Sequence, residues 1–151
     1  MRISAKADYA VRAAVEMAAA GDEPVKGEKL AEAQEIPLQF LEHILLELKH
    51  ARLVRARRGA RGGYWLARPP EEITLANVIR AVEGPLANIQ DQAPEQTKYP
   101  GNAEQLSEVW IAVRASLRRV LEKVTIADLR DGKIPADVLE LTRDEGARIT
   151  R

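Results

Sequence analysis

The sequence predicts a mainly α-helical fold with a small two-stranded hairpin in its first half and a long helix in its second half. Apolar residues recur at helical spacing in several segments, a glycine-rich turn separates two short apolar runs, and a heptad repeat follows later. The chain has 151 residues and no cysteine. A chain of this size can bury a sufficient core without disulfides or a structural metal.

Three helices are expected in the first 51 residues. Ser4 is a favourable N-cap for the first, which Gly21 ends, and a second short helix to about Gln34 lacks a Ser or Thr cap. Pro37 fits the first turn of the third helix, expected to end near Ala51. The apolar residues of this third helix repeat on one side, at Phe40, Leu41, Ile44, Leu45 and Leu48.

A hairpin and a fourth helix complete the expected N-terminal domain, residues 1–84. Residues 53–57 and 64–68 are short enough for strands, and three glycines lie between them. Thr74 can cap a helix that ends at Gly84, with Pro85 just beyond. Two paired helices followed by a basic hairpin are typical of a winged helix-turn-helix, in which the second paired helix enters the DNA major groove.

The second half is expected to hold a loop over residues 85–101, a long helix and a short helix over 102–131, and a charged, partly mobile tail over 132–151. Three prolines in this segment argue against an ordered helix there. The long helix carries a heptad repeat with an apolar stripe too wide for one neighbouring helix. We therefore expect a dimer interface made by Leu106, Trp110, Val113, Leu117, Val120 and Val124.

One basic segment lies within a chain of zero net charge. Residues 49–68 contain seven Lys or Arg and no Asp or Glu, which is typical of a nucleic-acid contact. On the third helix, Gln39, Glu42 and His43 can exchange hydrogen bonds with base edges, and Phe40 can touch a thymine methyl group. The candidate DNA contacts of the wing are Arg55, Arg57, Arg58 and Arg61. The competing interpretation is an ordinary solvated helix face and a solvated basic loop.

Other classes of function find little support in the sequence. His43 and His50 are about 10.5 Å apart along a helix, an awkward span for two ligands of one metal, so no metal site is expected. The turn at residues 58–63 joins two strands and is not a nucleotide-binding loop. We therefore expect no enzyme. No apolar run approaches the length of a membrane span, so we expect a soluble cytoplasmic protein without a membrane partner.

Several motifs resemble the Rrf2 family of bacterial transcriptional regulators, over roughly residues 1–129. They are MRISAKADYAVRA, IPLQFLEHIL, LVRARRGARGGYWLARP, EITLANVIRAVEG and VTIADL. The resemblance implies a dimeric winged-helix DNA binder, with DNA contacts at Gln39, Phe40, Glu42 and Arg58. Members of the family that bind an iron–sulfur cluster resemble one another in having three cysteines in the loop after the VEG motif. In this chain the motif is at residues 82–84, and the loop over residues 85–101 contains no cysteine. Asp8 lies where a carboxylate can complete the cluster in some relatives, but alone it is better explained as a residue of the first helical turn, where the helix dipole favours a negative charge. Without cysteine ligands, no iron–sulfur cofactor is expected.

The leading hypothesis is a homodimeric, sequence-specific transcriptional repressor that binds a double-stranded DNA operator independently of an iron–sulfur cluster. Its signal would come from an unknown small-molecule or protein effector. Tyr99 and Trp110 are candidates to line such a site, and the alternative is that both pack the hinge below the long helix. The second hypothesis is a protein-binding adaptor whose basic wing meets an acidic partner.

Overall fold

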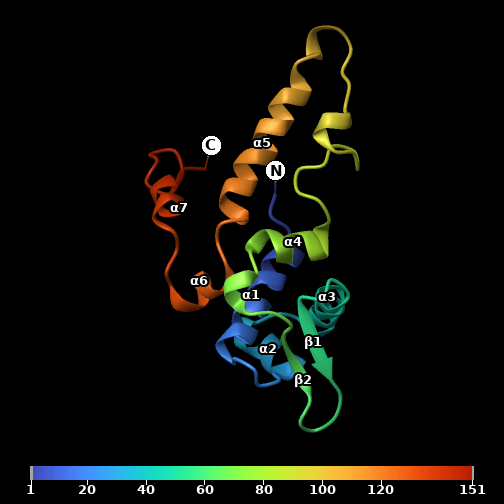
Figure 1. Ribbon diagram of the computed structural model, residues 1–151, viewed down its shortest axis with the longest axis vertical. Helices are drawn as coiled ribbons and strands as arrows, with labels where there is room; N and C mark the ends of the chain where they lie inside the picture. The colour runs from blue at the N-terminus through green and yellow to red at the C-terminus, as the bar shows by residue number, and fades with distance from the viewer. Residues whose placement is uncertain (1, 151) are drawn as a thin grey trace.

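The computed structural model describes residues 2–150 and confirms a mainly α winged helix-turn-helix fold with a two-stranded wing (Figure 1). A head made of the N-terminal helices, α6 and the hairpin lies at one end of the molecule, and helix α5 extends away from it. The helices of the first half are α1 (Ala5–Ala19), α2 (Gly27–Gln34), α3 (Leu38–His50) and α4 (Leu75–Glu83). Those of the second half are α5 (Leu106–Leu121), α6 (Ile126–Asp131) and α7 (Ala136–Leu141).

Helix α1 lies at the centre of the head and packs against α2, α3, α4, α6 and strand β2. Its buried face consists mainly of alanines, which let the neighbouring helices approach closely, together with Met17. Leu45 from α3, Ile73 before α4 and Ile126 from α6 are fully buried in the same core. The head is therefore one packed unit that fixes the orientation of α3.

Helices α1, α4 and α6 each begin at a side-chain N-cap, as the sequence predicts. The Ser4 hydroxyl accepts a hydrogen bond from the Ala7 amide, and Thr74 forms a reciprocal capping box with Asn77. Helix α2 has no side-chain cap. Pro37 is the N-cap of α3 and so lies just before its first turn.

The wing consists of β1 (Val54–Arg57) and β2 (Gly63–Leu66), paired antiparallel so that Arg55 lies opposite Trp65. The other edge of β2 is bound by Val25, whose backbone exchanges hydrogen bonds with Tyr64. Gly63 is required at this contact, because a Cβ there would lie 2.6 Å from the Val25 carbonyl oxygen. The base of the wing is thus held by the segment before α2.

The long helix starts at the first residue of its heptad repeat, a few residues after the expected bound at 102, and ends before the last residue of the repeat. Helix α5 begins at Leu106, after short 3₁₀ turns at Pro94–Gln96 and Gly101–Ala103. Val124, expected in the dimer seam, lies beyond the helix and is only 3% exposed. Its carbonyl accepts a hydrogen bond from the Leu75 amide, so Val124 is a head residue and not part of an exposed seam.

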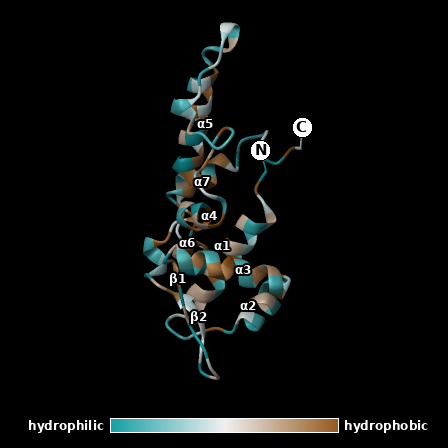
Figure 2. Cartoon of the chain, turned by 90° about the vertical axis from the view of Figure 1, so that its right-hand side faces the viewer, coloured by the Kyte–Doolittle hydropathy of each residue, from teal (hydrophilic) through white to brown (hydrophobic). Residues whose placement is uncertain are grey.

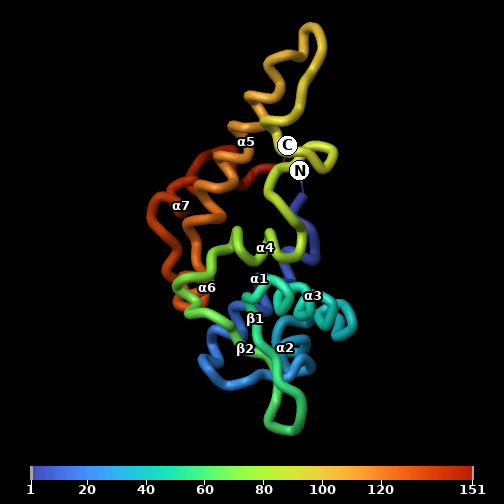
Figure 3. The backbone as a smooth tube through the Cα atoms, turned by 45° about the vertical axis from the view of Figure 1, so that its right-hand side comes forward, coloured from blue at the N-terminus to red at the C-terminus, as the bar shows by residue number. Residues whose placement is uncertain are grey.

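The loop before α5 is packed along that helix. It runs beside α5 and turns back at the far end (Figure 3). Trp110 Nε1 donates a hydrogen bond to the Tyr99 hydroxyl over 3.1 Å, and Arg114 forms an ion pair of 2.6 Å with Glu95. Pro94 is fully buried. Tyr99 and Trp110 therefore hold the loop against the long helix.

The C-terminal segment contains a helix that the sequence analysis did not predict. Thr125 and Asp128 form the expected capping box that begins α6. The segment then forms α7, where Asp137 pairs with Lys123 beside the base of α5. Over residues 2–150, no helix is long and apolar enough to cross a membrane.

Candidate nucleic-acid interface

Helix α3 buries one face in the head and presents the other to solvent. Leu41, Ile44 and Leu45 are fully buried, whereas Gln39, Glu42 and His43 are exposed. The three polar side chains named as base contacts therefore lie on the free face, where their amide, carboxylate and imidazole groups can meet a ligand.

Phe40 lies at the edge of this free face. It is 39% exposed and packs edge-to-face on Tyr9, with ring centroids 5.6 Å apart. The contact with α1 fixes the ring while leaving part of it open. Phe40 is thus available for an apolar contact such as a thymine methyl group.

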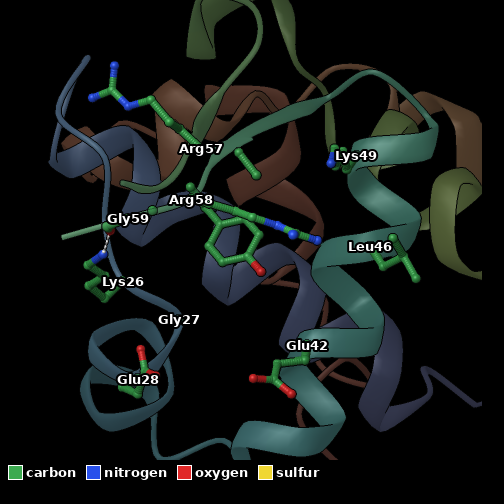
Figure 4. Close-up of a pocket in the computed structure, with 12 residues that line it drawn as sticks. Lys26, Gly27, Glu28, Glu42, Leu46, Lys49, Arg57, Arg58 and Gly59 are labelled. Atoms are coloured by element: carbon green, nitrogen blue, oxygen red, sulfur yellow. Dashed lines mark hydrogen bonds between the residues drawn. The ribbon is translucent and has the colours of Figure 1, made fainter. Parts of the chain in front are cut away.

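A groove of about 510 Å³ lies between α3 and the wing, and we call it the inner groove (Figure 4). Glu42 and Leu46 line it from α3, and Arg58 extends across it from the wing toward that helix. Lys26, at the start of α2, donates a hydrogen bond to the Gly59 carbonyl and so ties the wing tip to the head. The inner groove brings together a carboxylate and a guanidinium from the two expected DNA-binding elements.

Lys49, which begins the basic segment 49–68, also lines the inner groove, but the sequence analysis did not single out Lys26 or Leu46. Leu46 is 48% exposed, and its position off the buried repeat of α3 was the available signal. No sequence pattern indicates the role of Lys26, because Lys26 comes near the wing only through the pairing of its neighbour Val25 with β2.

The wing arginines do not share one surface. Arg57 and Arg58 both line the inner groove, but Arg58 crosses it, whereas the Arg57 side chain extends away from it. The Arg57 guanidinium lies 5.9 Å from the centroid of Trp65 and donates a hydrogen bond to the Arg61 carbonyl over 3.1 Å. Arg55 shares the Trp65 side of the hairpin, because residues opposite each other in an antiparallel pair lie on the same face. The basic residues of the wing are therefore divided between two surfaces.

In the part of the chain that the structure describes, the cations of residues 49–68 are not neutralised by ion pairs, unlike two cations on α1. Elsewhere in the head, Lys6 pairs with Glu47 and Arg12 with Asp8. Within residues 2–150, none of the seven cations between Lys49 and Arg68 has a carboxylate partner. A cluster of unneutralised cations creates a positive potential that attracts a polyanion.

Three of the carboxyl groups with a lowered pKa lie near α5, and the fourth, Asp131, lies beside Arg130 at the end of α6; none lines the inner groove. The Arg114 guanidinium hydrogen-bonds to Glu95 and lowers the pKa of that carboxyl group. Arg80 does the same to the pKa of Glu122, and Lys123 to that of Asp137. These pairs connect α5 to the loop, to α4 and to α7 respectively.

Helix α5 leaves its apolar stripe without a buried residue. Leu106, Trp110, Val113, Leu117 and Val120 are all only partly covered, and Val109 is 52% exposed. Figure 2 shows hydrophobic residues along the length of the helix, away from the head. Val120 also lines a cavity with Val138 and Leu141, so α7 covers one end of the stripe.

Comparison with known proteins places this geometry in a family. Residues 3–132 match the model of the Rrf2 family, described as iron-dependent transcriptional regulators. A Mycobacterium tuberculosis protein, provisionally named an HTH-type transcriptional regulator, is 50% identical over 149 residues, covering 98% of this chain and 92% of the relative. The HTH-type regulator CymR of Bacillus subtilis is 32% identical over 85% of this chain and 89% of its own length.

Solved structures agree with the sequence matches. The structure of CymR, the global cysteine regulator of B. subtilis, has a TM-score of 0.73 and 30% identity, over 87% of this chain and 98% of that one. T. potens IscR has a TM-score of 0.69 and 30% identity, over 100% and 93% of the two chains. These relatives are transcriptional regulators and not enzymes.

The residues of this chain do not fit an iron–sulfur cluster, despite the iron-dependent description of the family. Clusters are held by cysteine thiolates, and the sequence contains none. Among residues 2–150, no three His, Cys, Asp or Glu side chains gather to hold a metal. Asp8 is engaged instead by Arg12, at 3.0 Å.

Proposed function

Because this chain belongs to the Rrf2 family of transcriptional regulators, we propose that it is a homodimeric repressor that binds a DNA operator without an iron–sulfur cluster. The inner groove is the observation that carries the proposal. It combines Glu42 from a helix presented to solvent with Arg58 from a projecting hairpin. A duplex can be contacted by such a helix in its major groove and by such an arginine in its minor groove.

Each contact has a chemical role in this proposal. Gln39 can bond to both N6 and N7 of adenine, and the Glu42 carboxylate can accept from the amino group of cytosine. Arg58 suits the electronegative, narrow minor groove. Arg55 and Arg61 contact phosphates, which position the protein but carry no sequence information. His43 and Phe40 complete the contact surface of α3.

The α5 stripe supports the homodimer. A long helix whose apolar residues are all only partly covered leaves a surface that a second copy can bury. Two copies would place two α3 helices on successive major grooves, about 34 to 36 Å apart along the duplex. The operator would then be a pseudo-palindrome, and loss of the dimer would also weaken DNA binding.

Selection of genomic fragments by the purified protein tests the central claim. The selected operator should bind at least about 10³-fold more tightly than a random duplex at physiological salt. Transcription in vitro from a promoter that contains the operator should then fall as protein is added. Equal affinity for operator and random duplexes would contradict the proposal and favour the adaptor with an acidic protein partner.

Cluster independence has a separate test. Protein purified with and without oxygen should be colourless, and chelation or nitric oxide treatment should leave its operator affinity unchanged, because no thiolate is present to hold iron. A chromophore that disappears together with DNA binding would contradict this part of the proposal. The effector then remains to be found by screening small molecules and protein extracts against operator binding.

A further inference from the structure

A second basic surface lies on the opposite side of the wing from the inner groove. Its residues are Lys49, Arg52, Arg55, Trp65 and Arg68, and we call them the outer wing face. They line a separate cavity of about 460 Å³ that contains no Asp or Glu. The four cations of this face belong to the segment without ion-pair partners. Their charge has no neutralising group in the described chain.

The two surfaces of the wing differ in their chemistry. The inner groove contains the carboxylates Glu28 and Glu42 beside its cations, a mixture of acceptors and donors that suits base edges. The outer wing face offers only cations and the indole of Trp65. A surface with donors but no carboxylate suits phosphate oxygens, which are acceptors at every position of the duplex.

The two surfaces meet at the end of α3. Lys49 lines both the inner groove and the outer cavity, so no acidic residue separates them at that point. The minor groove is only about 6 Å wide, so a hairpin tip that enters it has a phosphate backbone on each side. With Arg58 in the minor groove, the outer wing face would lie toward the backbone across that groove from α3.

We propose that the outer wing face binds the sugar–phosphate backbone on the far side of the minor groove, so that each wing is clamped between two DNA strands. This inference rests on the proposed DNA-binding function. Arg55 and Arg68 contact phosphates, and Trp65, kept in place by the Arg57 guanidinium, packs against the sugars. The outer wing face supplies affinity and salt dependence, whereas the inner groove supplies sequence preference.

The double variant Arg55→Ala/Arg68→Ala tests the phosphate contacts. It should bind the operator at least about tenfold more weakly at 0.2 M salt, with the salt slope of log K reduced by about 4 for a dimer, close to one for each lost phosphate. Preference among single-base operator variants should not change. Lys98→Ala/Lys133→Ala removes two exposed cations elsewhere and should leave the slope as it was.

Ethylation interference and fluorescence locate the contact independently of stability. The double variant should lose interference at phosphates across the minor groove from those contacted by α3. In a Trp110→Phe background, Trp65 is the remaining tryptophan, and operator binding should protect it from acrylamide quenching.

Two results separate failure of this inference from failure of the proposed function. If the wild-type protein shows no operator preference, the proposed function is wrong and the inference falls with it. If operator preference is intact, while acrylamide quenching of Trp65 is the same with and without operator and the double variant keeps the wild-type salt slope, the inference alone is overturned. The outer wing face would then be free for an acidic protein.

Discussion

Gly62 offers the sharpest test of how the wing places its arginines. A Cβ atom built at this position would lie 2.0 Å from the carbonyl oxygen of Arg57 and 2.7 Å from its carbonyl carbon. These are backbone atoms of the paired strand, which cannot move aside as a side chain can. Gly62→Ala must therefore open the turn between β1 and β2, and Arg58 moves with it.

The expected cost follows from the size of this overlap. Rearrangement around an extra carbon typically costs about 1–3 kcal/mol. For a chain of this length, each kcal/mol lowers the melting temperature by roughly 2–4 °C, so a fall of about 2–12 °C is expected. The buried core of the head, which is built around α1, does not include this turn, so the helical circular dichroism signal at 20 °C should persist. Operator affinity should fall at least about tenfold, because Arg58 no longer crosses the inner groove.

Gly59→Ala is the matched control in the same turn. Its Cβ would meet no atom within 4 Å, although φ is +101°. The substitution therefore carries only backbone strain, of order 1–2 kcal/mol, and should weaken DNA binding less than Gly62→Ala. Thermal melts and titrations of a labelled operator measure both effects. If the Gly62→Ala variant melts at the wild-type temperature and binds the operator with wild-type affinity, the close contact between Gly62 and the Arg57 carbonyl is refuted.

Three further predictions address base reading, assembly and pH. Gln39→Ala should cost about 1–3 kcal/mol at one base pair, whereas equal losses on every single-base operator variant would place Gln39 off the base edges. Val113→Glu should convert the dimer to monomers in sedimentation and weaken operator binding, and an unchanged mass would show that α5 packs only within its own chain. The Arg80 pair lowers the pKa of Glu122 below its ordinary 4.5, so its stabilisation is present above that pH and lost as pH falls through the lowered value. The difference in melting temperature between wild type and Glu122→Gln should therefore shrink below pH 4.5, and a constant difference would contradict this.

Local signals made much of the fold predictable. Ser4, Thr74 and Thr125 each cap a helix through their own hydroxyl groups, so a few neighbouring residues determine where α1, α4 and α6 begin. The polar face of α3 was also predictable, because helical periodicity assigns Gln39 and Glu42 to the side opposite the buried leucines.

Features that depend on distant contacts were not predictable. The heptad repeat continues to Val124, but hydrogen bonding to the start of α4 draws that residue into the head. Helix α7 is short and lies beside α5 through the Lys123–Asp137 pair, which no local pattern indicates. The different directions of the Arg57 and Arg58 side chains depend on the strand register and the turn geometry. A count of arginines in a basic segment does not contain that information.

The junction between the head and α5 has a mechanical consequence. The Leu75 amide bonds to the Val124 carbonyl, the Ile126 amide bonds to the Ile73 carbonyl, and Arg80 pairs with Glu122. Three connections on both sides of one short turn resist rotation of α5 relative to α4. With 16 residues, α5 is about 24 Å long, so tilting it by about 10° moves its far end by roughly 4 Å. In the proposed dimer, a ligand that changes how the two α5 helices cross would therefore turn both heads and alter the distance between the two α3 helices.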